Sequence, residues 1–237
     1  MRGFVFLFFC FTLGLSQMNI INSSESENNF LFILNLDSLI HTNESDFIKP
    51  IFFDPTTRSY LHRIDLPGCI HLSTEIGYPD LPQTEVMLGI PQTGKVILSV
   101  HQSSSRIFND VNLAPIPKQS WDSTVFKKSE VYQENRYLPG PLAEIKEIGV
   151  MRNIRVARIL ISPAQYNPVT KELKVFDKLD ITLGFTEKPT VQPSPDFFDP
   201  IYEATLLNGK TAKDWKRISK TEPQIRNFFE SSNNWLK

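Results

Sequence analysis

The sequence predicts an all-β protein, a sandwich or barrel of antiparallel strands, and three observations lead to this fold class. Apolar and polar residues alternate over residues 172–185, which is the period of a strand with one buried and one solvated face. Before them, short β-rich segments bounded by Pro, Gly, Asn or Asp recur about every ten residues. These segments contain no long stretch with the 3.6-residue period of an amphipathic helix.

The chain begins with a predicted signal peptide at residues 1–16. A basic residue precedes an apolar run of about 13 residues, which is too short to span a bilayer. Gly14 and Ser16 place small side chains at the minus-three and minus-one positions of a cleavage site before Gln17. Cleavage would leave Cys69 as the only cysteine, so we expect a secreted, extracellular protein without an intrachain disulfide.

Residues 17–29 are rich in Ser, Asn and Glu and are expected to form a flexible segment. The predicted β body, residues 30–188, starts with the buried-strand pattern of Phe30–Leu36. The short strand segments that follow are Ile51–Phe53, Tyr60–Leu66, Thr84–Ile90, Lys95–His101 and Arg106–Val111.

The last predicted strands lie in the stretch Gly149–Phe185. Its second half alternates regularly, except that Asp177 falls on the apolar face and Phe176 on the polar face. Its first half, Val150–Ile161, changes parity near Ala157, which indicates a bulge or a strand covered on both faces towards its end. Turn residues separate the two halves, so we predict that they form one long antiparallel hairpin.

The composition changes after this stretch. Residues 189–200 contain four prolines and are predicted to form a semi-rigid linker. Residues 201–237 show a modest helical pattern that is broken at Asn208-Gly209, which predicts a partly helical tail.

The charges nearly cancel, with 25 basic and 26 acidic residues, so no field that would gather nucleic acid or anionic lipid is expected. Arg152, Arg155 and Arg158 recur every third residue, which spreads them over both faces of a strand. We therefore favour ion pairs across the sheet over a polyanion site. No membrane span is expected in the mature chain.

The sequence offers little catalytic or cofactor chemistry. The four histidines lack zinc-ligand spacing, and neither a phosphate loop nor a dinucleotide fingerprint occurs, so no metal or cofactor is expected. Cys69 and His71 would lie about 7 Å apart on one face of a strand, which is too far for a hydrogen bond. The favoured interpretation is a small buried Cys beside a surface His, and a hydrolase using this pair is a remote alternative.

Several motifs, in this order, resemble the N-terminal propeptide of gingipain-type cysteine peptidases. They are GYPDLP, VMLGIPQTGKVILSV and the block Tyr137–Phe185, with its Pro139-Gly140, Ser162-Pro163 and Gln165-Tyr166-Asn167-Pro168. Ile201-Tyr202, Leu206-Leu207-Asn208 and Trp215 in the tail resemble the end of that propeptide. The resemblance implies a jelly-roll-like β-sandwich with a short helical C-terminal tail.

In such precursors the prodomain accompanies a secreted peptidase through export, assists its folding and keeps it latent by covering the active-site cleft. The resemblance implies that a loop side chain can occupy the specificity pocket, and that this side chain is basic for peptidases cleaving after Arg or Lys. Lys127, Lys128 and Arg136 are the candidates for this inhibitory contact. Ordinary solvated charges are the favoured reading of all three.

The peptidase domain, with its catalytic Cys and His, should begin in the tail, residues 201–237, and is missing from the sequence. We therefore expect this chain to have no catalytic residues of its own and to partner a gingipain-like catalytic domain in cis or in trans. An extracellular adhesion or structural β-sandwich without an enzyme partner is the alternative function.

Overall fold

The computed structural model describes residues 19–26, 29–36, 43, 47–55, 57–191 and 197–217. The predicted signal peptide, residues 1–16, lies outside the described residues. Every pairing between the named strands is antiparallel, and two sheets share one apolar core. The predicted antiparallel β-sandwich is therefore confirmed.

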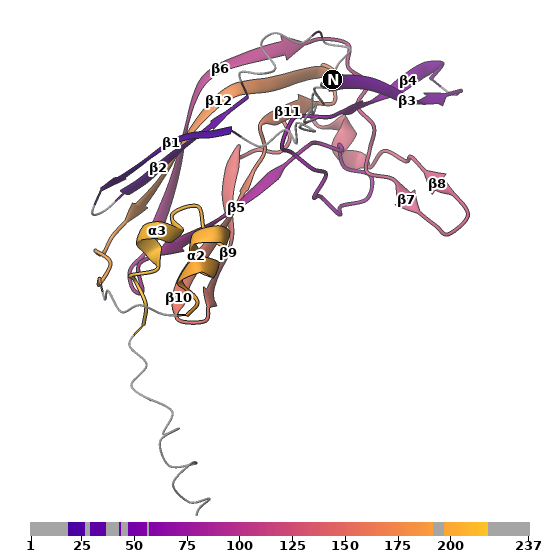
Figure 1. The fold of residues 1–237 in the computed structure, drawn as a ribbon. Helices are drawn as coiled ribbons and strands as arrows, with labels where there is room; N and C mark the ends of the chain where they lie inside the picture. The colour runs from indigo at the N-terminus through magenta and orange to yellow at the C-terminus, as the bar shows by residue number, and fades with distance from the viewer. Residues whose placement is uncertain are drawn as a thin grey trace, which may run out of the picture.

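The larger sheet is built around one long central strand, and it can be followed along the upper part of Figure 1. Strand β6 pairs along one edge of the central strand, whereas β11 and β2 share the other edge, and β1 pairs with β2. The strands are β1 (Asn19–Ser26), β2 (Asn29–Asn35), β6 (Val96–Phe108), β11 (Ala164–Asn167) and the central β12 (Glu172–Phe185).

Strand β1 corrects the expectation of a flexible segment at residues 17–29. A polar, Ser-rich and Asn-rich stretch is a weak strand former on its own. Here it becomes a strand by pairing with the apolar β2, a long-range gain that local composition does not reveal.

The smaller sheet has three strands in the order β5–β10–β9, comprising β5 (Thr84–Ile90), β9 (Ala143–Met151) and β10 (Ile154–Ile161). The predicted long hairpin of residues 149–185 is therefore wrong, because β10 and β12 belong to different sheets. Alternation identifies the buried face of a strand and leaves its neighbours undetermined. At Ser162-Pro163 the chain leaves one sheet and enters the other at β11.

The irregularity expected in the first half of the stretch 149–185 is present, and the second half has one as well. The register of β10 against β9 shifts between Arg158 and Ile159, and the last three residues of β10 are all buried. The register of β12 against β6 shifts around Asp177, whose buried carboxylate accepts a hydrogen bond from Arg106 Nε at 3.1 Å. The two exceptions to the alternation in β12 thus mark a bulge.

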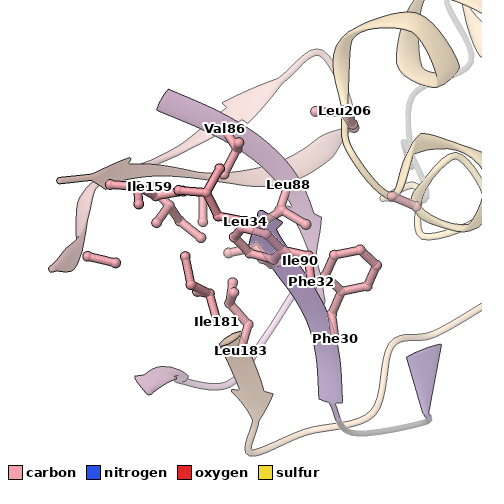
Figure 2. Close-up of a cluster of buried hydrophobic side chains, with 14 of the residues drawn as sticks. Phe30, Phe32, Leu34, Val86, Leu88, Ile90, Ile159, Ile181, Leu183 and Leu206 are labelled. Carbon is pink, nitrogen blue, oxygen red and sulfur yellow. The ribbon is translucent and has the colours of Figure 1, made fainter. Parts of the chain in front are cut away.

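The main core lies between the two sheets, where Figure 2 shows side chains of β2, β5, β10 and β12 converging. The tail contributes to the same core through helices α2 (Asp199–Thr205) and α3 (Gly209–Ala212). Tyr202 and Ala212 are fully buried, and Trp215 packs against Phe185 with ring centroids 6.2 Å apart. Residues 197–217 are therefore an integral part of the body.

A second core lies at the end of the molecule away from the tail helices. It includes Phe47, Ile64, Leu113, Tyr166 and Leu173. Two hairpins extend from this end on the right of Figure 1. They are β3 (Ile48–Asp54) with β4 (Ser59–Ile64), and β7 (Lys118–Gln119) with β8 (Thr124–Val125). The 3-10 helix η2 (Glu130–Gln133) follows the second hairpin. Within the described residues, no helix is long and apolar enough to cross a bilayer, the two helices of the tail included.

Candidate functional site

The strongest candidate for a binding surface is the end of the molecule that carries the β3–β4 and β7–β8 hairpins, which we call the two-hairpin end (Figure 1). The rings of Phe52 in β3 and Phe126 after β8 lie 5.4 Å apart, centroid to centroid. This contact joins the two hairpins, so they present one surface.

Apolar side chains are unusually exposed at the two-hairpin end. Trp121, at the tip of the β7–β8 hairpin, is 100% exposed. The turn that carries it is closed by a hydrogen bond of 2.8 Å from Ser120 N to Ser123 O. Further exposed apolar residues of the two hairpins are Ile51, Phe52, Phe53, Tyr60 and Val125. Such a concentration of exposed apolar side chains is typical of a protein interaction site.

Lys128 does not extend freely into solvent, although it is one of the three predicted contact residues. Its Nζ donates a hydrogen bond of 2.7 Å to Asn112 Oδ1 and lies 4.9 Å from the centroid of the Tyr132 ring. Burial, and secondarily the charge of Lys171, lower the pKa of Lys128. Asn112 Nδ2 also donates to Tyr60 O in β4, so Lys128 braces one hairpin against the other.

The segment that follows β8 is held against Gly77. Both the backbone N and the Oγ of Ser129 donate to Gly77 O, each at 3.0 Å. Gly77 has φ +87°, and a Cβ there would lie 3.0 Å from Lys127 O. Only glycine fits this close approach without strain. The backbone at Lys127 is therefore fixed, while the Lys127 side chain remains exposed.

Arg136, the third predicted contact residue, has a different setting. Its exposed guanidinium forms an ion pair with Glu134. It also lines a groove of about 370 Å³. The groove floor includes Leu81, Leu138 and Leu160. The structure thus places Lys127 and Lys128 beside the β7–β8 hairpin and Arg136 at the groove.

The Cys69 and His71 pair is arranged against catalysis. Burial raises the pKa of the Cys69 thiol to about 12, so the thiol is protonated at neutral pH. His71 Nδ1 lies 2.7 Å from Asp80 Oδ1, and Arg63 Nε donates to His71 Nε2 at 3.2 Å. Both ring nitrogens are thus engaged, and none of the contacts found among the described residues joins His71 to Cys69. The favoured reading, a small buried Cys beside a surface His, holds only in part, because Cys69 is partly buried and the His71 side chain is only 16% exposed.

Cross-strand pairing is confirmed for Arg158. Its guanidinium lies 3.2 Å from Glu147 on β9 and 3.7 Å from Glu85 on β5. Arg155 instead donates to backbone carbonyls beyond the end of β5, and Arg152 stacks on an aromatic ring of the tail. All three arginines therefore serve the fold.

Trp121 is not among the contact residues that the sequence predicts. A signal was present, because this tryptophan interrupts the polar region of residues 118–136, where burial in a core strand is not expected. The exposed aromatic residues of β3 were assigned to a strand, and their exposure could not be inferred from a three-residue segment.

The chain is similar to known proteins in sequence and in fold. The model of the family Propeptide_C25 matches residues 50–215 of the chain. Gingipain R2 of Porphyromonas gingivalis is 24% identical over 184 residues, covering 68% of this chain and 25% of that protein. Lys-gingipain of the same species is 24% identical over 154 residues, covering 59% of this chain and 9% of that protein. The chain thus spans a quarter or less of the length of these relatives.

Two solved structures share the fold. One, described as the complex of Porphyromonas gingivalis RgpB pro- and mature domains, has a TM-score of 0.68 at 19% identity and covers 82% of this chain and 98% of its own. The other, concerned with the zymogenic latency of gingipain K from Porphyromonas gingivalis, has a TM-score of 0.55 at 17% identity and covers 73% of this chain and 96% of its own. The sandwich, its packed tail and the family match over residues 50–215 lead to one conclusion: the chain belongs to the Propeptide_C25 family, the propeptides of gingipain-type cysteine peptidases.

Proposed function

We propose that this propeptide domain binds the catalytic domain of a gingipain-type cysteine peptidase, in cis or in trans, and keeps that peptidase latent. The observation that carries the proposal is the two-hairpin end, which is exposed, apolar and internally braced. A surface that is already ordered binds without the entropic cost of ordering loops. The structural neighbours support this reading, since one is a complex of pro- and mature domains and the other concerns zymogenic latency.

Of the three basic candidates, Lys127 is the one we propose for contact with the peptidase. Its side chain is exposed beside the β7–β8 hairpin while its backbone is fixed against Gly77. Lys128 is occupied with Asn112, and Arg136 is paired with Glu134. A basic side chain on a rigid backbone suits a carboxylate at or near a specificity pocket.

The test is inhibition of a mature peptidase. The purified chain, added at micromolar concentration to mature gingipain R2 and, separately, to Lys-gingipain, is expected to slow at least one of them. Lys127→Ala should weaken that inhibition about tenfold, as expected when an interface residue of ordinary strength is truncated. Lys210→Ala, an exposed lysine on α3, is the matched control and should leave inhibition unchanged. Failure of the unaltered chain to slow either peptidase would favour the adhesion or structural module.

We further propose that the domain is exported and assists the export and folding of its peptidase. The motivation is the N-terminal apolar run with small residues before Gln17. N-terminal sequencing of the secreted protein should begin at Gln17, and a start at Met1 would contradict export by this signal. Refolding the denatured peptidase with and without the domain tests assistance, which predicts a higher yield of active enzyme with the domain present.

A further inference from the structure

Trp121 is the most exposed large apolar side chain of the described residues, and it lies in the turn of the β7–β8 hairpin at the two-hairpin end. A tryptophan can bury about 150–250 Å² of surface when it enters an apolar site. Within this domain it contacts no core. Its exposure therefore indicates a contact with another molecule.

The hairpin that carries Trp121 is short but well held. Its strands are closed by the hydrogen bond from Ser120 N to Ser123 O, and Ser123 Oγ donates to Asp122 Oδ1 at 3.2 Å. At its base, Phe126 packs on the ring of Phe52. The indole is thus presented from a fixed support, which reduces the conformational entropy lost on binding.

The two-hairpin end as a whole has the composition of an interaction surface. Exposed aromatic residues of the neighbouring hairpin, Phe53 and Tyr60, pack edge to face at 5.2 Å. Charges of both signs, among them Asp122 and Lys127, lie on the β7–β8 hairpin or directly after it. An exposed aromatic side chain on a surface that also carries apolar and charged residues is typical of a protein interface. The mixed charge does not favour an anionic membrane surface.

We propose that Trp121 is the anchor of the interface with the peptidase and enters an apolar pocket of that partner that accepts an aromatic side chain. This inference rests on the proposed function and adds the chemistry of the contact. The candidates from the sequence were all basic, whereas the geometry assigns the leading position to an indole. Lys127 then provides a polar contact beside the anchor.

The experiment measures binding of immobilised full-length chain to mature gingipain R2 and to Lys-gingipain by surface plasmon resonance. Trp121→Ala is expected to weaken the affinity at least about 30-fold, the range of an interface hot spot. Trp121→Phe should retain most of the affinity, and Trp121→Arg should lose as much as alanine does. Ile97→Ala, which removes a 59% exposed apolar side chain from β6, is the matched control.

The outcomes separate the two proposals. If the unaltered chain binds neither peptidase, the proposed function is refuted, and so is the assignment of the peptidase as the partner of Trp121. If the unaltered chain binds and Trp121→Ala binds within twofold of it, only the anchor is refuted. Tighter binding by Trp121→Arg would overturn the apolar pocket in favour of an acidic one. Loss of binding to phosphatidylserine vesicles on Trp121→Ala, with peptidase affinity unchanged, would assign the anchor to membranes instead.

Discussion

Lys127 and Lys128 are adjacent in the chain and both are exposed, but their contacts differ. The Nζ of Lys128 is held by Asn112 and by the face of the Tyr132 ring, whereas the side chain of Lys127 is exposed. The hydrogen bond and the ring contact tie the Lys128 ammonium to the support of the hairpin, whereas the exposed Lys127 ammonium is available to a partner. Two neighbouring lysines can thus serve structure and binding separately.

This difference should appear in stability. We expect Lys128→Met to lower the free energy of unfolding by about 1–3 kcal/mol, because Asn112 Oδ1 loses its partly buried donor. Lys127→Met should change it by less than about 0.5 kcal/mol. Urea unfolding followed by circular dichroism measures both. Equal effects of the two substitutions would contradict the bracing role of Lys128.

The Cys69 thiol makes stability depend on alkaline pH. Its pKa is raised by burial from 9.0 to about 12, so above pH 9 the unfolded chain loses a proton that the folded chain keeps. The unfolded state then binds fewer protons, and the free energy of unfolding falls as pH rises, by at most about 1.4 kcal/mol per pH unit. The contribution is fully present below pH 9 and is lost towards pH 12.

Cys69→Ala should remove that part of the pH dependence. The quantity to measure is the difference in unfolding free energy between the original chain and Cys69→Ala at several pH values from about 8 to 11. Other groups cancel in this difference, including Tyr132, whose pKa burial also raises. Parallel pH curves for the two chains would show that the thiol ionises equally in both states.

At the level of elements, the tail takes the place of a fourth strand beside β5. Asn208 Oδ1 accepts a hydrogen bond of 2.8 Å from Gly89 N, and Asn208 Nδ2 donates to Gly89 O at 2.9 Å. Leu207 N donates to Met87 O at 2.9 Å. The side-chain amide thus imitates strand pairing and covers backbone groups of β5 that would otherwise form an open sheet edge.

Glycine at position 89 is required by this close packing. A Cβ on Gly89 would lie 2.2 Å from the Cβ of Ala212, whereas a Cβ on Gly149 meets nothing within 4 Å. We expect Gly89→Ala to cost about 1–3 kcal/mol of stability and Gly149→Ala less than about 0.5 kcal/mol. The measurement is the urea midpoint of each variant.

A double variant identifies the cause. Ala212→Gly removes the methyl group that Gly89→Ala would meet, so the combined variant should be more stable than the sum of the two single costs implies. Strict additivity would show that the tail does not pack on β5 as described.

Periodicity predicted these elements better than it predicted their partners. The alternation in residues 172–185 identified the buried face of β12, and the parity change near Ala157 precedes the end of β10, where the last three residues are all buried. Strand pairing depends on contacts far apart in sequence, so the predicted hairpin was wrong and the polar β1 was missed. For the same reason, the sequence identified Lys128 as a candidate but could not show that its ammonium group is hydrogen-bonded to Asn112.

For the whole molecule, one core joins both sheets and the tail. Side chains of β2, β5, β10 and β12 pack with Tyr202, Leu206, Ala212 and Trp215. A shared core makes the parts cooperative, because none can separate without exposing apolar surface of the others. The domain should therefore unfold as one unit.

Two probes can test this cooperativity. In a chain with Trp121→Phe and Trp235→Phe, the remaining Trp215 reports on the tail, where it is 3% exposed. Its fluorescence and the far-UV circular dichroism of the strands should give coincident urea transitions. A fluorescence transition at lower urea would mean that residues 197–217 detach before the sheets unfold.

The position of the tail in the chain also orders events during biosynthesis. A chain is both synthesised and exported from its N-terminus, so Tyr202, Ala212 and Trp215 become available for packing after every strand of both sheets. Until these residues emerge, the apolar side chains that they cover are exposed to solvent, and the edge of β5 is unpaired. A chain at this stage is incompletely packed and exposes apolar surface and the edge of β5, to which other chains could bind. Its packing is complete only when the residues up to 217 have emerged.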